Sequence, residues 1–225
     1  MTVRIHRRPD DLPTGAEIEP WQDVPVAIAV DLVPTEQLDH HIRPINPPGR
    51  QPKLFGLAVT ARCTPPDFGA ILYALQHVGP GDVLVIAADG VDHTGMIGEI
   101  LSGYLKRLGA SGLVCDGAIR DVATLAAWGD FSVFARAVNP RGPTSAAEGD
   151  VNLPVTIGDR LIRPGDLIIG DDDGLAALSP ATLRSRLGDA EAKRALEATW
   201  VEGLANSKAI NEIFDLETPD KADDH

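Results

Sequence analysis

The chain has 225 residues, of which 44% are hydrophobic and 24% charged, a composition typical of a soluble globular protein with a substantial buried core. Its formal net charge of −13 at pH 7 repels phosphate backbones and anionic lipid, so we expect no nucleic-acid partner and no membrane partner. No apolar run approaches the ~18 residues of a spanning helix, and the opening MTVRIHRRPDDLP turns polar at once, unlike a secretory signal.

Both cysteines, Cys63 and Cys115, lie in apolar stretches. No spacing of cysteine and histidine supports a zinc site, so buried free thiols are expected rather than a disulfide or a metal centre. Free thiols are typical of a reducing compartment, and we therefore predict a cytoplasmic protein.

Taken in chain order, residues 1–24 are polar and proline-bearing and are predicted to form an N-terminal arm. VPVAIAVDLV (24–33) is apolar and β-branched, which favours a strand, and KLFGLAVTARC (53–63) favours another. PDFGAILYALQHV (66–78) carries apolar residues at helical spacing and ends at the strong stop Gly79-Pro80-Gly81.

A regular alternation follows. GDVLVIAADG (81–90) predicts a strand buried on both faces, GEILSGYLKRLG (98–109) a helix, and SGLVCDG (111–117) a second buried strand. DVATLAAWGD (121–130) then predicts a helix and FSVFARAVNP (131–140) a strand. Strands that alternate with helices in this way indicate an α/β fold.

The last third of the chain changes character. Residues 151–180 alternate between apolar and polar, with a tight hairpin turn at Gly158-Asp159, and predict a β-rich layer that completes a domain spanning 25–180. Amphipathic helix is expected over 179–204, broken near Gly188, within a C-terminal helical extension at 181–215. Residues 216–225 are acidic and poor in apolar residues, so we expect a disordered tail.

Two loops carry the residues that suggest chemistry. AADGVDHTGMIGE lies between a predicted strand and helix, and the free amides at the start of that helix, residues 98–101, form an anion site. CDGAIRD lies at the next such junction, so both loops open on one edge if the strands are neighbours. There Arg120 can bind a carboxylate through two hydrogen bonds, and Asp121 can hold a hard divalent cation. Glu99 approaches the same point from the other loop.

Simpler interpretations of these residues remain open at this point. An adjacent Arg-Asp pair is also common as a surface ion pair, and Asp121 or Glu99 in a first helical turn is favoured by the helix dipole alone. His93 is either a substrate contact or an exposed loop histidine, and Arg141 either steers a distal carboxylate or supports a turn. GxGxxG is absent, so no dinucleotide is expected.

The order of these motifs resembles a known family. GMIGEI, with RD beginning twenty positions after its last residue, is similar to the signature of the class II 4-hydroxy-4-methyl-2-oxoglutarate / 4-carboxy-4-hydroxy-2-oxoadipate aldolases. The non-aldolase relatives of these enzymes are regulators of ribonuclease E activity. GPGDVLVI, GLVCDGAIRDV, FSVFARAVNPRGP and GDVNLPVTIGDRLIRPGDLIIGDDDGLAAL extend the resemblance over about residues 55–200. It implies an α/β layered sandwich of the swivelling-domain type, assembled as trimers or hexamers with active sites between subunits.

The resemblance also implies roles for particular residues. Asp121 would ligate Mg²⁺ or Mn²⁺, Glu99 would reach that ion through water, and Arg120 would bind pyruvate and stabilise its enolate. Backbone amides of four residues would hold the pyruvate carboxylate, namely Gly98, Glu99, Ile100 and Leu101. A glutamate from the neighbouring subunit's C-terminal helix would complete the pocket, with Glu191 the best match and Glu197 the second.

The implied activity is a metal-dependent retro-aldol cleavage of a 4-hydroxy-2-oxo diacid to pyruvate and an oxo acid, with oxaloacetate decarboxylation as a second route to the same enolate. The motif contains no lysine, which argues against a Schiff-base aldolase. Thr124 stands where the family often has an acidic residue, and Glu99 where many members have aspartate. The alternatives are a non-catalytic protein that binds and regulates a ribonuclease, and a related metal-dependent lyase with another substrate.

Overall fold

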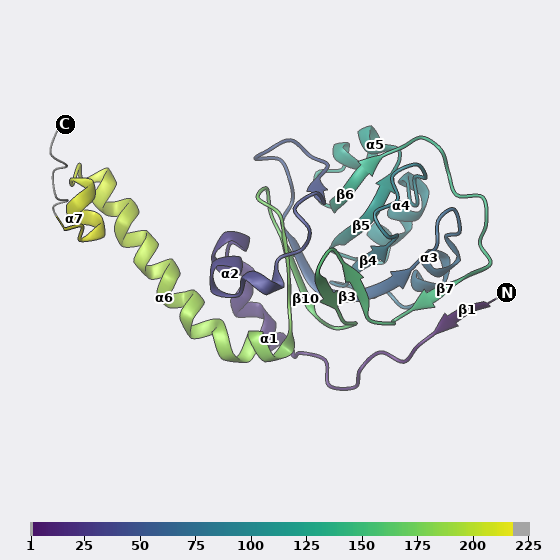
Figure 1. Ribbon diagram of the computed structural model, residues 1–225, viewed down its shortest axis with the longest axis horizontal. Coiled ribbons are helices and arrows are strands. Elements are labelled where there is room, and N and C mark those ends of the chain that lie inside the picture. The colour runs from purple at the N-terminus through teal and green to yellow at the C-terminus, as the bar shows by residue number, and fades with distance from the viewer. Residues whose placement is uncertain (1, 218–225) are drawn as a thin grey trace, which may run out of the picture.

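The structure is a computed structural model, which describes residues 2–217. A mixed β-sheet forms the centre of the protein (Figure 1). Its strands in spatial order are β1 (Thr2–Ile5), β7 (Glu148–Val151), β3 (Leu54–Arg62), β4 (Val83–Ala87), β5 (Gly112–Ile119), β6 (Ser132–Val138) and β2 (Arg43–Pro44). Strands β3, β4, β5 and β6 are parallel neighbours. Their carboxyl ends therefore meet at one edge, where ligands bind in α/β folds.

Three helices cover one face of the parallel strands: α3 (Gly69–Ala74), α4 (Glu99–Arg107) and α5 (Val122–Ala127). The core between them contains Ile71, Leu105 and Leu125 from the helices against apolar strand residues. Each of these helices follows directly on β3, β4 or β5 in the chain. The predicted strand–helix alternation from residue 53 to residue 140 is thus confirmed.

The opposite face of the sheet is covered by β structure. The antiparallel hairpin of β8 (Val155–Ile157) and β9 (Arg160–Ile162) packs over it, and Val155, Ile157 and Ile162 join Val114 and Phe134 of the sheet in a second core cluster. Strands β10 (Leu167–Gly170) and β11 (Leu175–Leu178) extend from the first half of β3. The predicted β-rich layer and its turn at residues 158–159 are confirmed.

A third apolar cluster joins the N-terminal and C-terminal segments to β10 and β11. Buried Trp21 and Ala29 meet Ile169, Leu183 and Ala190 there. The segments that supply it, or flank it, are α1 (Gly15–Ile18), η1 (Glu19–Asp23), α2 (Val26–Leu32), η2 (Pro34–Glu36) and α6 (Pro180–Ala205). The prediction of a strand over 24–33 is wrong. A short apolar run fits either type of element, and here contacts with β11 and α6 select the helix.

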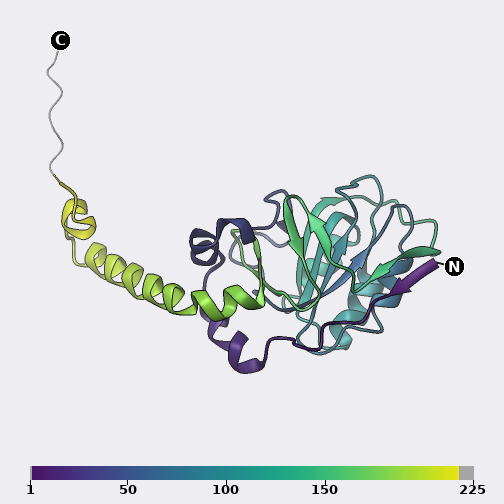
Figure 2. The ribbon, with the colours of Figure 1, turned by 60° about the horizontal axis from the view of Figure 1, so that its bottom comes forward.

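The long helix α6 begins on the body of the molecule and then projects away from it, ending near α7 (Ile210–Phe214) (Figures 1 and 2). Ser179 caps its first turn by accepting a hydrogen bond from the Thr182 amide, and Pro180 occupies the first helical position, which suits its missing N–H. The predicted break near Gly188 is wrong, because one glycine costs a helix only ~1 kcal/mol relative to alanine.

The N-terminal segment is tied to the sheet rather than loose. β1 pairs with β7, and the buried carboxylate of Asp150 accepts hydrogen bonds from Arg4 and Arg62 and lies 2.9 Å from Nε2 of His6. Most of the tail for which we expect disorder, residues 218–225, lies outside the described residues. Within residues 2–217, no helix has both the length and the apolar character needed to cross a bilayer.

Candidate functional site

The two glycine-bearing loops meet at the carboxyl ends of β4 and β5. These strands pair in parallel from Val83↔Gly112 to Ala87↔Asp116, and the loop after β4 then runs alongside the end of β5. The Met96 amide donates to the Ala118 carbonyl at 2.8 Å, and the Arg120 amide donates to the Ile97 carbonyl at 3.0 Å. This short ladder places the start of α4 directly beside Arg120 and Asp121, as the sequence predicts for neighbouring strands.

Asp121 is held in a strained backbone conformation at the junction of β5 and α5. Its φ of 61° and ψ of 32° lie in the left-handed region, which non-glycine residues seldom adopt. Its Oδ2 accepts a hydrogen bond of 3.0 Å from the Glu99 amide and lies 3.7 Å from Nε of Arg120. One carboxylate therefore links the helix start, the guanidinium and the end of the strand.

Two glycines leave the space that the Arg120 and Asp121 side chains occupy. A Cβ on Gly98 would lie 2.2 Å from Oδ2 of Asp121 and 2.8 Å from Cγ of Arg120. A Cβ on Gly142, in the loop after β6, would lie 2.5 Å from Nη1 of Arg120. Any larger residue at either position would displace the charged groups, so the sequence requirement at these glycines is steric.

The start of α4 presents free amide donors at the same place. The first bond within the helix runs from the Ser102 amide to the Gly98 carbonyl at 3.1 Å, so the amides of Ile100 and Leu101 precede it and have no acceptor inside the helix. The Glu99 amide, which the sequence also suggests as a ligand donor, is already bonded to Asp121. Two helix amides therefore remain for an anion, next to a fixed positive charge.

A pocket of about 270 Å³ opens over these groups. Arg120 and Asp121 are the charged residues of its lining, and the rest is apolar or glycine, consisting of Phe68, Leu72, residues 95–98, Ile100, Leu101 and Pro143. At ~30 Å³ per water, this space holds about nine waters and so admits a small organic acid. The side chains of Arg120 and Asp121 are 40% and 37% exposed, so both face the opening rather than a packed interior.

The apolar wall was missed by sequence reasoning. Phe68 and Leu72 come from the region of α3, and Pro143 comes from the loop after β6, far from the motif in sequence. The only signal was the segment NPRGP at the carboxyl end of the β6 strand, which parallel packing brings to the same edge.

Other predicted residues lie outside the pocket. Glu191 is exposed on α6, and Glu197 is half-buried farther along it, and Figure 1 shows this helix projecting on the side of the body away from α4 and α5. A single chain does not bring either glutamate to Arg120. His93 is exposed, and the Arg141 carbonyl accepts a bond of 2.7 Å from the Gly95 amide, which supports the loop. Thr124 is exposed on α5.

Asp121, which lines the pocket, and Glu99, which follows the pocket residue Gly98 in the chain, fit a hard divalent cation that keeps much of its water. Asp121 offers one carboxylate, and Glu99 carries an exposed carboxylate one residue beyond Gly98. Mg²⁺ and Mn²⁺ accept one or two carboxylates and fill the other positions with water or substrate, whereas a structural zinc site needs four protein ligands. Among residues 2–217, Asp121 belongs to no group of three histidine, cysteine or carboxylate side chains whose ligand atoms converge.

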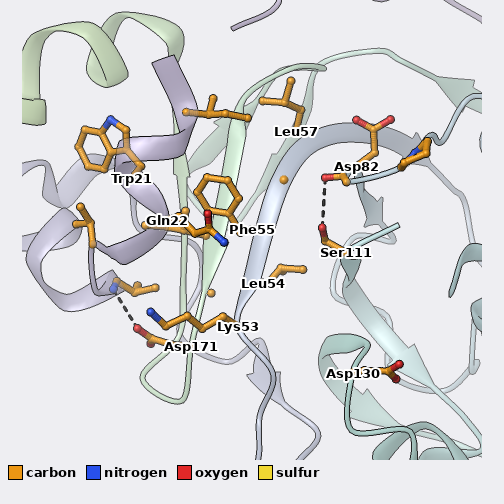
Figure 3. Close-up of a pocket in the computed structure, with 18 residues that line it drawn as sticks. Trp21, Gln22, Lys53, Leu54, Phe55, Leu57, Asp82, Ser111, Asp130 and Asp171 are labelled. Carbon is orange, nitrogen blue, oxygen red and sulfur yellow. Dashed lines mark hydrogen bonds between the residues drawn. The ribbon is translucent and has the colours of Figure 1, made fainter. Parts of the chain in front are cut away.

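A second cavity, of about 500 Å³, lies between the N-terminal segment and β3 (Figure 3). Trp21, Phe55 and Leu57 give it an apolar character. Its acidic residues come from separate elements, and two of them are engaged elsewhere: Asp171 accepts from the Val26 amide at 3.0 Å, and Asp82 is paired with Arg8. Among residues 2–217, no ion pair joins the charged residues of its lining to one another, so it is a weaker candidate for catalysis.

Comparison with known proteins places this geometry in a family. The model of the RraA-like family, described as Aldolase/RraA, matches residues 27–176. A protein of Halalkalibacterium halodurans called a putative 4-hydroxy-4-methyl-2-oxoglutarate aldolase is 35% identical over 154 residues, which are 68% of this chain and 71% of that protein.

Solved structures share the fold. RraAS2 of Streptomyces coelicolor, described as an unusual member of the RNase ES inhibitor RraA protein family, has a TM-score of 0.73 at 28% identity over 83% of this chain and 96% of its own. The RNA-processing inhibitor RraA of Thermus thermophilis has a TM-score of 0.62 at 25% identity, covering 70% of this chain and 93% of its own. An uncharacterized protein of Pseudomonas syringae has a TM-score of 0.79 at 20% identity, covering 89% of this chain and 98% of its own. The chain therefore belongs to the RraA-like Aldolase/RraA family and has its α/β fold, with a long C-terminal helix.

Proposed function

We propose that the protein is a divalent-metal-dependent pyruvate aldolase that cleaves a 4-hydroxy-2-oxo diacid to pyruvate and an oxo acid. The observation that carries this proposal is the convergence at Asp121, whose carboxylate lies 3.0 Å from the Glu99 amide and 3.7 Å from the Arg120 guanidinium, at the mouth of a small pocket. The name of the 35% identical relative supports the same class of reaction.

The chemistry requires negative charge to be stabilised next to a ketone. The C4 hydroxyl gives its proton to water and becomes the carbonyl of the oxo acid as the C3–C4 bond breaks. The bonding electrons stay on the pyruvate fragment as an enolate, which later takes up a proton at C3. Arg120 supplies fixed positive charge where that oxyanion develops, which is worth about 3–4 kcal/mol if it resembles one oxyanion-hole donor. A bound divalent cation supplies Lewis acidity toward the keto oxygen and the carboxylate.

The helix start holds the other end of the same fragment. The amides of Ile100 and Leu101 and the positive end of the α4 dipole attract the carboxylate of a 2-oxo acid. This local attraction is needed because the whole chain carries a net charge of −13, which repels an anionic substrate. The apolar wall excludes water from the side of the reacting carbons.

Asp121 and Glu99 are the groups that would hold the cation, Mg²⁺ or Mn²⁺. The hydrogen bond from the Glu99 amide fixes the orientation of the Asp121 carboxylate. Because the left-handed backbone at Asp121 would cost free energy without such a constraint, its presence here supports a functional role for the residue.

We further propose that the active unit is a trimer or hexamer in which a neighbouring copy supplies Glu191 to each pocket. The projecting end of α6 and the helix α7 support this, because they expose large apolar side chains that a lone chain leaves in water: Leu196, Val201, Leu204, Ile210 and Phe214. A helix with such a surface is typical of an element that packs against another chain.

A pyruvate-release assay tests the proposal. Wild-type protein with Mg²⁺ or Mn²⁺ should release pyruvate from 4-hydroxy-4-methyl-2-oxoglutarate, and Arg120→Ala or Asp121→Ala should abolish release. EDTA should silence the wild type, and added metal should restore it. Oxaloacetate decarboxylation yields the same enolate and should respond in parallel. Near-normal turnover in either variant, or indifference to EDTA, would reject the mechanism.

Binding and regulation of a ribonuclease is the second candidate, supported by the names of the RraA structures that share the fold. Such a regulator needs a contact surface and no charged pocket. A pull-down with a ribonuclease, run beside the pyruvate assay, separates the two functions. Capture of the ribonuclease together with no pyruvate release would favour the regulator over the aldolase.

A further inference from the structure

A second cluster of potential metal ligands lies in the loop before β2, at residues 39–41. Leu38 and Ile42 flank the cluster, and both are buried in the second core cluster, on the sheet face opposite α3, α4 and α5. The Leu38 amide donates to the Leu175 carbonyl at 3.0 Å, and the Ile42 amide donates to the Asp39 carbonyl at 3.0 Å. The loop is therefore tied to β11 at Leu38 and closed on itself by a turn from Asp39 to Ile42.

Asp39 is oriented by a guanidinium below it. Its Oδ2 accepts a hydrogen bond of 2.7 Å from Nη2 of Arg136, while its Oδ1 accepts one of 2.9 Å from the His41 amide. These two contacts fix the orientation of the Asp39 carboxylate. Oδ1 is the oxygen that faces the two histidines.

The positive charge of Arg136 is already offset from its other side. Its Nε donates to Oδ1 of Asp116 at 2.8 Å, and the Asp116 side chain is only 5% exposed. Two carboxylates, from Asp39 and Asp116, thus share one guanidinium. The three groups together carry a formal charge of −1. A cation beside Asp39 is attracted rather than repelled by this group of charges.

The two imidazoles converge on Oδ1 of Asp39. Nδ1 of His41 lies 2.8 Å from Oδ1 of Asp39, Nδ1 of His40 lies 3.9 Å from it, and the ring centroids are 4.0 Å apart. Tetrahedral ligands at zinc distances, ~2.0–2.2 Å, are separated by roughly 3.3 Å. The two distances from histidine Nδ1 to Asp39 Oδ1 lie on either side of that value, and each would match it if the atoms moved by about 0.6 Å or less.

From these contacts we propose that Asp39, His40 and His41 form a second metal site, separate from Asp121 and selective for a transition ion such as Zn²⁺. Two imidazole nitrogens with one carboxylate oxygen suit Zn²⁺, Cu²⁺ or Ni²⁺, whereas Mg²⁺ prefers oxygen ligands alone. On binding, the ion takes the Nδ1 lone pairs, and each neutral imidazole carries its single proton on Nε2.

The site is open on its outer side. The side chains of His40 and His41 are 73% and 63% exposed, and a cavity of about 570 Å³, lined also by Gln37 and Asp159, adjoins them. Three protein ligands with water in the remaining position describe an exchangeable site rather than a closed structural one. Among the described residues 2–217, this is the sole group of three histidine, cysteine or carboxylate side chains whose ligand atoms converge.

Calorimetric titration with Zn²⁺ tests the proposal on tag-free, full-length protein in an Asp121→Asn background, which weakens the other cation site. Wild-type residues at 39–41 should bind one Zn²⁺ per chain, and Co²⁺ should give the visible absorption of a tetrahedral nitrogen–oxygen site. His40→Gln and His41→Gln should each weaken Zn²⁺ binding by about tenfold or more, and the double variant should abolish the cobalt band. His93→Gln and His77→Gln, both at exposed positions outside the cluster, are the matched controls.

The two histidine substitutions carry the test because Asp39→Asn would also disturb Arg136 and risks the fold. Circular dichroism should show the same secondary structure in every variant, and Zn²⁺ should raise the melting temperature of the parent but not of the double variant. Unchanged Zn²⁺ affinity in the double variant, or equal losses in the His93 and His77 controls, would overturn the proposal. Because neither readout involves turnover, its failure leaves the aldolase assignment untouched.

Discussion

Adding a single methyl group at Gly98 should inactivate the protein without unfolding it. In Gly98→Ala the new Cβ would lie 2.2 Å from Oδ2 of Asp121 and 2.8 Å from Cγ of Arg120. Ordinary contact begins at 3.4 Å, so the carboxylate oxygen must retreat by about 1.2 Å. The retreat also breaks its bond to the Glu99 amide. A misplacement of ~1 Å in a catalytic group can cost about 100-fold in rate, and two such groups move here.

The fold should survive this change for a specific reason. Gly98 has φ −143° and ψ −163°, an extended conformation that alanine adopts freely, and the atoms it meets belong to partly exposed side chains. Gly188→Ala is the matched control, since a Cβ there meets nothing within 4 Å and the α6 helix gains up to ~1 kcal/mol. The assay is pyruvate release with coupled detection, beside thermal melting. If Gly98→Ala is as active as Gly188→Ala, the inferred site is wrong.

Three further predictions concern stability and reactivity. Burial raises the pKa of the Cys63 thiol to about 12 and raises that of Cys115 further, so neither should react with a thiol reagent at neutral pH until the protein unfolds; rapid labelling of native protein would contradict the model. Burial alone would raise the pKa of Asp150, but hydrogen bonds from Arg4, His6 and Arg62 lower it more, so its contribution to stability is present above the unfolded pKa of ~3.9 and lost as pH falls. In Asp150→Asn the free energy of unfolding should therefore fall less steeply as the pH is lowered below about 4. An unchanged dependence of the unfolding free energy on acid pH would refute this. Buried Asp67 accepts hydrogen bonds from Ser145 Oγ and the amides of Gly69, Ala147 and Glu148, so Asp67→Ala should cost about 3 kcal/mol or more in chemical denaturation, whereas a loss below about 1 kcal/mol would show that these bonds contribute little.

The alternation of strands and helices from β3 to β6 followed from periodicity because each element there has one dominant environment. The buried strand β4 is continuously apolar, β5 is apolar apart from Asp116, and α4 has apolar residues at helical spacing, with Leu105 buried in the core. The segment 24–33 shows where this reasoning stops. Its β-branched residues favour a strand locally, yet the space between β11 and α6 accepts a helix, and only the tertiary contacts reveal that.

Part of the candidate site could likewise be predicted from the sequence, and part depends on tertiary packing. Adjacent parallel strands required Glu99 and Asp121 to meet, and the structure places the Glu99 amide 3.0 Å from the Asp121 carboxylate. The wall from Phe68 and Leu72 depends on how α3 packs, which no local pattern encodes. The pair His40-His41 gave no usable signal as sequence, because its meaning depends on Arg136, 95 or more residues away, which orients Asp39.

The most direct test of the central claim is the exchange of pyruvate methyl protons with solvent deuterium, followed by proton NMR. Protonation of the enolate ends the proposed reaction, so the same site run backward must form that enolate from pyruvate. The wild type with Mg²⁺ should exchange the methyl protons, EDTA should stop the exchange, and Arg120→Gln should lose at least ~100-fold of it. No exchange in the wild type, or equal exchange in Arg120→Gln, would contradict a site at which Arg120 and a cation held by Asp121 stabilise an enolate.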